Sequence, residues 1–151
     1  MKGPVAEASR GRLTLAGVAV KDDPSVAAIL SGAGVRFAYL FGSRASGQDQ
    51  DNSDADIAVM PSRPLGLLER ERLSLGLTRA LDVPEVDLIS LDRASLELRG
   101  RVIQDGVRIF SVDEPARVGF EVRTRSEYFD FVPTLRVLER SYLARVAERG
   151  L

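Results

Sequence analysis

The chain has 151 residues and a formal net charge of −1, with 44% hydrophobic and 28% charged residues. These values predict one globular domain and give no charge-driven attraction of the whole protein to nucleic acid or membranes, so neither is expected as a partner. The chain holds neither cysteine nor histidine, which excludes disulfides and thiolate metal sites and leaves acid–base chemistry to carboxylates.

Residues 1–22 are predicted to form a loose N-terminal segment, because they begin with a polar stretch and show no clear periodicity. They lack the apolar core of a secretory signal peptide. No apolar run elsewhere in the chain approaches transmembrane length. A cytoplasmic location is therefore expected.

A short helix and a buried strand are predicted next. Asp23 suits the N-cap position and Pro24 the first helical position, and Gly32 and Gly34 stop the helix. Residues 35–41, VRFAYLF, form a short run rich in β-forming residues that ends at a turn signal. Such a run is typical of a buried strand.

The turn after this strand has residues that suit a phosphate. Gly42 lets another group approach the backbone closely. Ser43 is a good N-cap, so residues 43–46 predict one helical turn whose free N–H groups and partial positive charge favour an anion. Arg44 adds a planar donor that matches phosphate oxygens. We therefore predict that Gly42, Ser43 and Arg44 bind a nucleotide.

Two aspartates open the next apolar run, residues 57–60. Asp54 and Asp56 lie two residues apart at the start of a strand, and the period of a strand places both carboxylates on one face. Two like charges this close repel each other unless a proton or a cation lies between them. Mg²⁺ uses one or two carboxylates and completes its shell with water and substrate phosphates. The pair therefore predicts a magnesium–nucleotide site beside Gly42.

The aspartate-rich stretch 49–56 has other interpretations. Taken alone, it is typical of a solvated turn. A calcium loop fits poorly, because Asp54 stands where that loop needs glycine and Met60 where it needs glutamate. A P-loop is excluded because its GK[ST] ending is absent. The Asp-x-Asp of sugar transferases stays open, although those folds usually need a longer chain.

A helix and a third strand follow. Residues 65–81 read as a helix with Leu73 and Leu77 on its buried face, and the charged run 69–72 is interpreted as its solvated face. Residues 86–91 are predicted as a strand in which Asp87, Ile89 and Leu91 share one face. A carboxylate buried among apolar neighbours is costly without a partner, and a shared metal would answer that cost at Asp87.

The last part of the chain is predicted to be mainly helical. Asp92 is expected to cap a helix that ends at residues 105–106, and residues 107–112 to form a fourth strand. From residue 115 the pattern is helical to the end, and Pro133 is expected to kink or break it. A stripe recurs there at three- and four-residue spacing and consists of Tyr128, Val132, Leu135, Leu138, Tyr142 and Val146.

Two interpretations of this C-terminal stripe stay open. In the first, it packs on the core of the same chain. In the second, part of it docks a partner or a second copy, because the segment holds more aromatic residues than one short sheet can cover and exposed aromatics favour interfaces. Arginines outnumber acids in the segment, which is only weak evidence for RNA.

The order of these motifs resembles a known signature. Gly42-Ser43, then Asp54-x-Asp56, then Asp87 on a later strand, is similar to the signature of the polymerase-β-like nucleotidyltransferases. The chain most resembles the minimal nucleotidyltransferases (MNT) encoded beside HEPN-domain toxins, the MntA-type adenylyltransferase antitoxins. The resemblance implies an α/β fold with a small mixed sheet flanked by helices and a C-terminal helical segment.

The resemblance also implies a division of the chain and a reaction. Residues 23–114 would be the nucleotidyltransferase core and 115–151 a helical segment packed on it, in one domain overall. Asp54, Asp56 and Asp87 would be both metal ligands and catalytic residues, holding two Mg²⁺ ions. Asp87 would lower the pKa of the acceptor hydroxyl or take its proton. AMP would pass from ATP to a tyrosine of a cognate HEPN toxin.

Two alternatives to this function remain. One is a nucleotidyltransferase that acts on a small molecule such as an antibiotic. Such an enzyme usually carries a dedicated substrate domain, and the residues after Asp87 leave little room for one. The other is an antitoxin that neutralises its toxin by binding alone. The chain is not expected to be the HEPN nuclease itself, because such nucleases depend on a histidine and this chain has none.

Overall fold

The computed structural model describes residues 20–42 and 54–149. Four strands form one sheet in the order β3-β2-β1-β4, in which β2 and β3 are parallel and the other pairs antiparallel. The predicted α/β fold with a small mixed sheet is confirmed. The elements in chain order are α2 (Pro24–Gly32), β1 (Val35–Phe41), β2 (Ala55–Pro61), α4 (Leu67–Leu81), β3 (Val86–Ser90), α5 (Leu96–Asp105), β4 (Val107–Ser111) and α6 (Glu114–Arg149).

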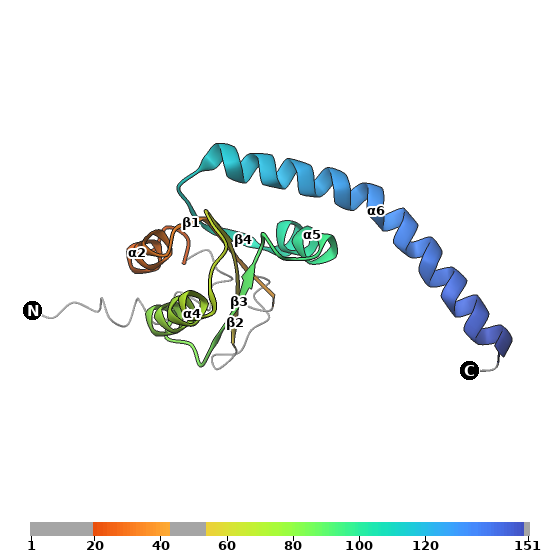
Figure 1. Ribbon diagram of the computed structural model, residues 1–151, viewed down its shortest axis with the longest axis horizontal. Helices are drawn as coiled ribbons and strands as arrows, with labels where there is room; N and C mark the ends of the chain where they lie inside the picture. Colours follow the sequence, from red (N-terminus) through yellow and green to blue (C-terminus); the bar gives the residue numbers. More distant parts are fainter. Residues whose placement is uncertain (1–19, 43–53, 150–151) are drawn as a thin grey trace, which may run out of the picture.

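Helices cover both faces of the sheet (Figure 1). Helices α2 and α4 lie on one face, where Leu40 and Ile57 are fully buried against side chains such as Leu77. Helix α5 and the first part of α6 lie on the other face, over Phe37 and Leu91. The strands alternate between these two apolar layers, as expected for a sheet that is covered on both sides.

Helix α2 begins and ends as its sequence predicts. The carboxylate of Asp23 accepts hydrogen bonds from the backbone N–H groups of Ser25 at 2.9 Å and Val26 at 3.3 Å, and Pro24 occupies the first turn. The chain then turns through Gly34, whose φ of +74° favours glycine. Just before the helix, Val20 is 2% exposed and packs in the core, although it belongs to the segment expected to be loose.

The charged run 69–72 of helix α4 was predicted to be solvated, and the structure differs from this prediction. The first turn of the helix is closed by Glu69, whose carboxylate accepts a hydrogen bond from the backbone of Gly66 at 3.2 Å. Arg70 does not lie on a solvated face, because its guanidinium reaches across to β3 and donates to the carbonyl of Leu88 at 3.1 Å. The interpretation of the whole run as solvated was therefore wrong at Arg70.

The cap predicted for α5 was also wrong. Ser95, not Asp92, precedes the helix, and its hydroxyl accepts a hydrogen bond from the backbone N–H of Leu98 at 3.2 Å. Asp92 instead accepts a hydrogen bond from the hydroxyl of Ser90 in the turn after β3. Both residue types suit an N-cap, and the turn geometry that chooses between them is not visible in the sequence.

Helix α6 is a single helix of 36 residues that continues through Pro133, so the segment is not broken there. Its first part packs over the core, where Phe120 is 6% exposed and Thr124 is fully buried. Its second part stands clear of the sheet and of the other helices, after a bend (Figure 1). None of the helices described here combines the length and the apolar character needed to span a membrane.

Candidate active site

The site forms where β1 ends and β2 begins. Gly42 follows β1 with a φ of +77°, a conformation that side-chain-bearing residues rarely adopt. A Cβ built on Gly42 would lie 2.3 Å from the Oδ2 atom of Asp56. The carboxylate of Asp56 therefore occupies the space that a side chain at position 42 would need. Ser43 and Arg44, the other predicted nucleotide-binding residues, lie outside the described residues.

Strand register brings two of the predicted carboxylates together. Asp56 on β2 is paired with Phe41 on β1 and with Asp87 on β3. Neighbouring strands lie about 4.8 Å apart, and paired residues point to the same face, so Asp56 and Asp87 are side by side. Asp54 precedes β2 by one residue and has the same parity as Asp56. The structure thus gathers Asp54, Asp56 and Asp87 at one edge of the sheet.

The electrostatics of this edge follow from the burial of Asp56 and from the charges beside it. Burial raises the pKa of Asp56 above its usual value, and the charges of Asp87 and Asp54 raise it further. Asp54 and Asp87 themselves are exposed, so the desolvation cost considered for Asp87 falls mainly on Asp56. Like charges held this close favour a proton or a cation between them.

The donor set fits a hard cation with an open coordination shell. Among the described residues no three or more acidic, histidine or cysteine side chains form a ready-made cage for a metal. Mg²⁺ does not require one, because it binds through one or two carboxylates and keeps water and substrate phosphates as its other ligands. An acidic edge that is open beside Gly42 suits such an ion and the phosphates it accompanies.

The scaffold under the acidic edge is rigid. Strand β2 is central in the sheet, and Ala55 and Ile57 are fully buried on either side of Asp56. The backbone N–H of Ala55 donates to the carbonyl of Glu85 at 3.0 Å, which fixes the start of β2 against the start of β3. Side chains on such elements are held more precisely than side chains on loops.

A polar network that was not predicted from the sequence joins β1 to α6. The hydroxyl of Tyr39 donates to Oε1 of Glu121 at 2.6 Å, and Arg117 donates to the same oxygen at 2.9 Å. Burial is the main cause that raises the pKa of Tyr39, and the Glu121 carboxylate raises it further. The spacing of Glu114, Arg117 and Glu121 was the only signal for this network, since acids and bases three or four residues apart meet on a helix.

Comparison with known proteins identifies the family. The family described as "Polymerase beta, Nucleotidyltransferase" matches residues 25–115, more than half of the chain. This chain belongs to that family. Gly42, Asp54, Asp56 and Asp87 all lie within the matched residues, so the resemblance inferred from their order is confirmed.

A curated relative and several solved structures narrow the resemblance. The chain is 38% identical over 90 residues to the protein adenylyltransferase MntA of Shewanella oneidensis strain MR-1, a match that covers 60% of this chain and 63% of MntA. It therefore spans somewhat less than two thirds of that relative's length. The predicted similarity to MntA-type proteins is also confirmed.

Two of the similar solved structures are toxin–antitoxin complexes. One, a toxin–antitoxin complex with AMP-PNP, matches with a TM-score of 0.68 and 28% identity, covering 81% of this chain and 98% of the other. The second is a tri-AMPylated Shewanella oneidensis HEPN toxin in complex with its MNT antitoxin, with a TM-score of 0.61 and 28% identity, covering 77% and 91%.

Proposed function

We propose that this chain is a Mg²⁺-dependent adenylyltransferase that moves AMP from ATP to a tyrosine of a cognate HEPN toxin, and so acts as an antitoxin. The observation that carries the proposal is the acidic edge, where Asp56 lies in register with Asp87 and against Gly42. Support for ATP and for a protein acceptor comes from the relatives, which include an adenylyltransferase and a complex with an AMPylated toxin.

The proposed reaction is a single displacement at phosphorus. The oxygen of the acceptor hydroxyl forms a bond to the α-phosphorus of ATP, the bond from that phosphorus to the bridging oxygen breaks, and pyrophosphate leaves with the electron pair. The hydroxyl proton passes to Asp87 or to water. Asp87 suits this role because it is exposed at the start of β3 and therefore open to an incoming acceptor.

Asp54, Asp56 and Asp87 would hold the metal, with two ions expected from the family resemblance. When bound, Mg²⁺ supplies charge that stabilises the attacking and leaving oxygens. The backbone at Gly42, together with Ser43 and Arg44, is proposed to hold the phosphates of ATP. Catalysis of this kind depends mostly on positioning and electrostatics, which the buried β2 strand can provide.

Modification of a tyrosine would inactivate the toxin through charge and size. An AMP group brings a negative phosphate and a bulky nucleoside to a hydroxyl that was neutral. Near a site that binds RNA phosphates, both properties oppose binding. The fold does not support a small-molecule substrate. The described chain after β4 consists of one helix, α6, and so contains no separate substrate domain.

The test is a reconstituted reaction with the cognate HEPN-domain toxin that the proposal requires. The two purified proteins are mixed with ATP and Mg²⁺, and the intact mass of each is measured. The proposal expects the toxin to gain one or more AMP units, with no gain when Asp54→Asn replaces the wild type. A matched control, Glu71→Gln, changes an exposed carboxylate on α4 and should leave the gain intact.

Each contrary outcome points to a different alternative. Toxin inhibition without any mass gain would favour an antitoxin that acts by binding alone. Transfer of AMP by the Asp54→Asn variant at the normal rate would overturn the metal assignment. Transfer to a small hydroxyl compound but never to the toxin would favour the antibiotic-type enzyme.

A further inference from the structure

Helix α6 carries one face from the core out into solvent. Along the first part this face is built into the protein, and along the second part the same face continues at three-, four- and seven-residue spacing. The residues are Phe120, Thr124 and Tyr128 over the core, then Phe131, Leu138, Tyr142 and Val146 beyond it. Residues at this spacing share one side of a helix. We call the last four the distal face.

The first part of the helix is anchored by aromatic packing. The rings of Phe120 and Phe37 have centroids 5.4 Å apart. Tyr128 lies in a notch left by Gly100 on α5, where a Cβ would fall 2.3 Å from the Cδ2 atom of the tyrosine ring. The direction of α6 is thus set by the core, and the distal face is presented on a helix whose base is fixed.

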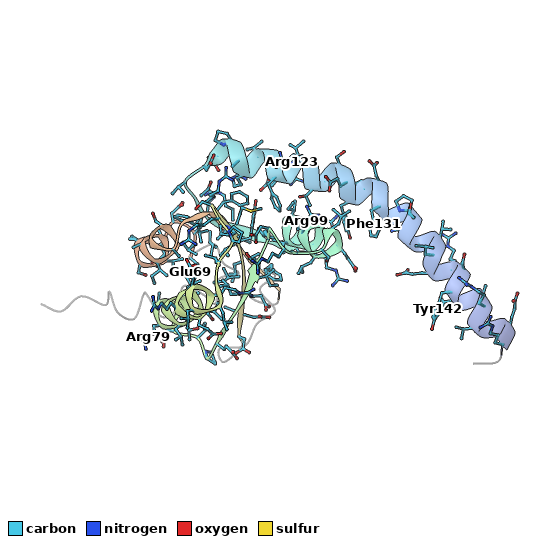
Figure 2. The ribbon with its side chains drawn as sticks, viewed as in Figure 1. Glu69, Arg79, Arg99, Arg123, Phe131 and Tyr142 are labelled. Atoms are coloured by element: carbon cyan, nitrogen blue, oxygen red, sulfur yellow. The ribbon has the colours of Figure 1, made fainter. Side chains whose placement is uncertain are left out.

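Two of the four distal-face residues are exposed although they are apolar, whereas Phe131 and Val146 are half-buried. Leu138 is 57% exposed and Tyr142 is 64% exposed. Figure 2 shows Phe131 and Tyr142 on the inner side of the bent helix, the side toward the rest of the molecule. From residue 131 to 146 a helix extends about 23 Å. An apolar stripe of this length on an otherwise solvated helix marks a surface for another protein.

The distal face and the acidic edge lie on the same side of the sheet. Asp56 shares its strand face with Ala58, and Asp87 shares its own with Leu91. Both Ala58 and Leu91 pack in the apolar layer under α5 and α6, together with Phe120. One partner can therefore touch the distal face and present a hydroxyl at the acidic edge.

We propose that the distal face docks a helix of the cognate HEPN toxin. This inference rests on the proposed function. A standard interface buries about 800 Å² on each partner, more than four side chains on one helix supply. The partner must therefore also contact another part of this chain. A toxin that presents a hydroxyl at the acidic edge, on the same side of the sheet, supplies such a contact, and the similar solved structures include complexes of a toxin with its antitoxin.

The end of the distal face indicates the chemistry of the toxin surface. Arg145 and Arg149 border a shallow groove with Tyr142 and Val146. Arg145 donates to the carbonyl of Ser141 on its own helix, and among the residues described here no carboxylate forms an ion pair with either arginine. The docked helix is therefore expected to pair an apolar stripe with an acidic residue at this end.

The test compares two leucines with matched exposure. Leu138→Glu places a charge in the distal face, and Leu75→Glu places the same charge on α4, where Leu75 is 55% exposed. Glutamate is a good helix former, so both variants should fold. For each protein we would measure the dissociation constant for the cognate HEPN-domain toxin, the rate of AMP mass gain of that toxin, and the thermal shift with ATP and Mg²⁺.

The expected result is at least a tenfold weaker toxin affinity and a slower mass gain for Leu138→Glu, with an unchanged ATP-dependent shift. Leu75→Glu should match the wild type in all three measurements. Equal toxin affinity in all proteins, with normal transfer, would overturn the docking surface and leave the proposed function standing. If Leu138→Glu only dissociates a dimer of this chain in sedimentation, the occupant is a second copy. A wild type that neither binds nor modifies the toxin would instead overturn the proposed function.

Discussion

The carboxylate of Asp56 lies against the backbone of Gly42, so closely that a Cβ at Gly42 would be 2.3 Å from Oδ2. Gly42 directly follows β1 and Asp56 lies in β2, and Ser43 and Arg44 stand between them in the sequence. Their contact joins the predicted phosphate-binding turn to the predicted metal-binding pair. Asp56 can therefore take its present position only because residue 42 has no side chain.

Gly42→Ala should impair the site more than the fold. Alanine at a φ of +77° is strained by roughly 1 kcal/mol, and its Cβ would displace the Asp56 carboxylate. We expect AMP transfer to fall by tenfold or more, measured as toxin mass gain. Gly32→Ala is the control, because nothing lies within 4 Å of its added Cβ and it should keep full activity. A fully active Gly42→Ala protein would mean that Asp56 does not need its present position.

The strands were predictable because each is short, apolar and bounded by turn residues. Residues 35–41 were expected as a strand and form β1, and the predicted neighbour relation of Asp54 and Asp56 follows from strand parity alone. The pairing of Asp56 with Asp87 was not visible in the sequence, because register depends on long-range packing between β2 and β3. The family resemblance implied only that the two carboxylates share a metal.

The errors came from local choices that tertiary contacts decide. Asp92 and Ser95 were both suitable caps, and the hydrogen bond from Ser90 to Asp92 favours Ser95 as the cap. Arg70 has the pattern of a solvated residue, yet it bonds a carbonyl on β3. Pro133 is not such an error, because it was expected to kink or break the segment, and α6 continues through it but bends along its course (Figure 1).

Asp56→Asn should abolish transfer while the fold survives. The Asp56 carboxylate is held partly buried between two other carboxylates, which raises its pKa and costs stability without a cation. Removal of this charge should therefore leave the melting temperature in EDTA unchanged or slightly higher than that of the wild type. A variant with normal transfer, or one that is clearly less stable in EDTA, would contradict the charge-repulsion account.

ATP with Mg²⁺ should stabilise the wild type, and EDTA should remove the effect. A ligand that binds only the folded state adds about 2.7 kcal/mol at a hundredfold excess over its dissociation constant. Thermal unfolding with ATP alone, Mg²⁺ alone and both together separates the contributions. Asp54→Asn serves as the comparison and should show a smaller shift. A wild type insensitive to every combination would count against a magnesium–nucleotide site.

The junction of β4 and α6 should weaken in acid. Arg117 donates to Glu114 at 2.9 Å and Ser111 donates to it at 2.6 Å, and these bonds lower the pKa of Glu114 from 4.5 to about 2. Because the folded pKa is the lower one, the stabilisation is fully present above pH 4.5 and is lost as the pH falls toward 2. Glu114→Gln should thus melt below the wild type at pH 7 and together with it near pH 2. Glu139→Gln, at an exposed position on α6, should melt like the wild type throughout.

Gly100→Ala should misdirect α6 by filling the notch that holds Tyr128. The added Cβ would lie 2.3 Å from the tyrosine ring, so the ring and the helix backbone must move apart. Overpacking of this kind costs about 1–3 kcal/mol. The acidic edge is not part of this contact, so the thermal shift with ATP and Mg²⁺ should persist while toxin affinity falls. Gly32→Ala is again the control, since nothing lies within 4 Å of its added Cβ. The double variant Gly100→Ala with Tyr128→Ala should regain stability relative to Gly100→Ala alone, because the clash is gone. If the single variant binds toxin as well as the wild type does, the direction of α6 does not govern docking.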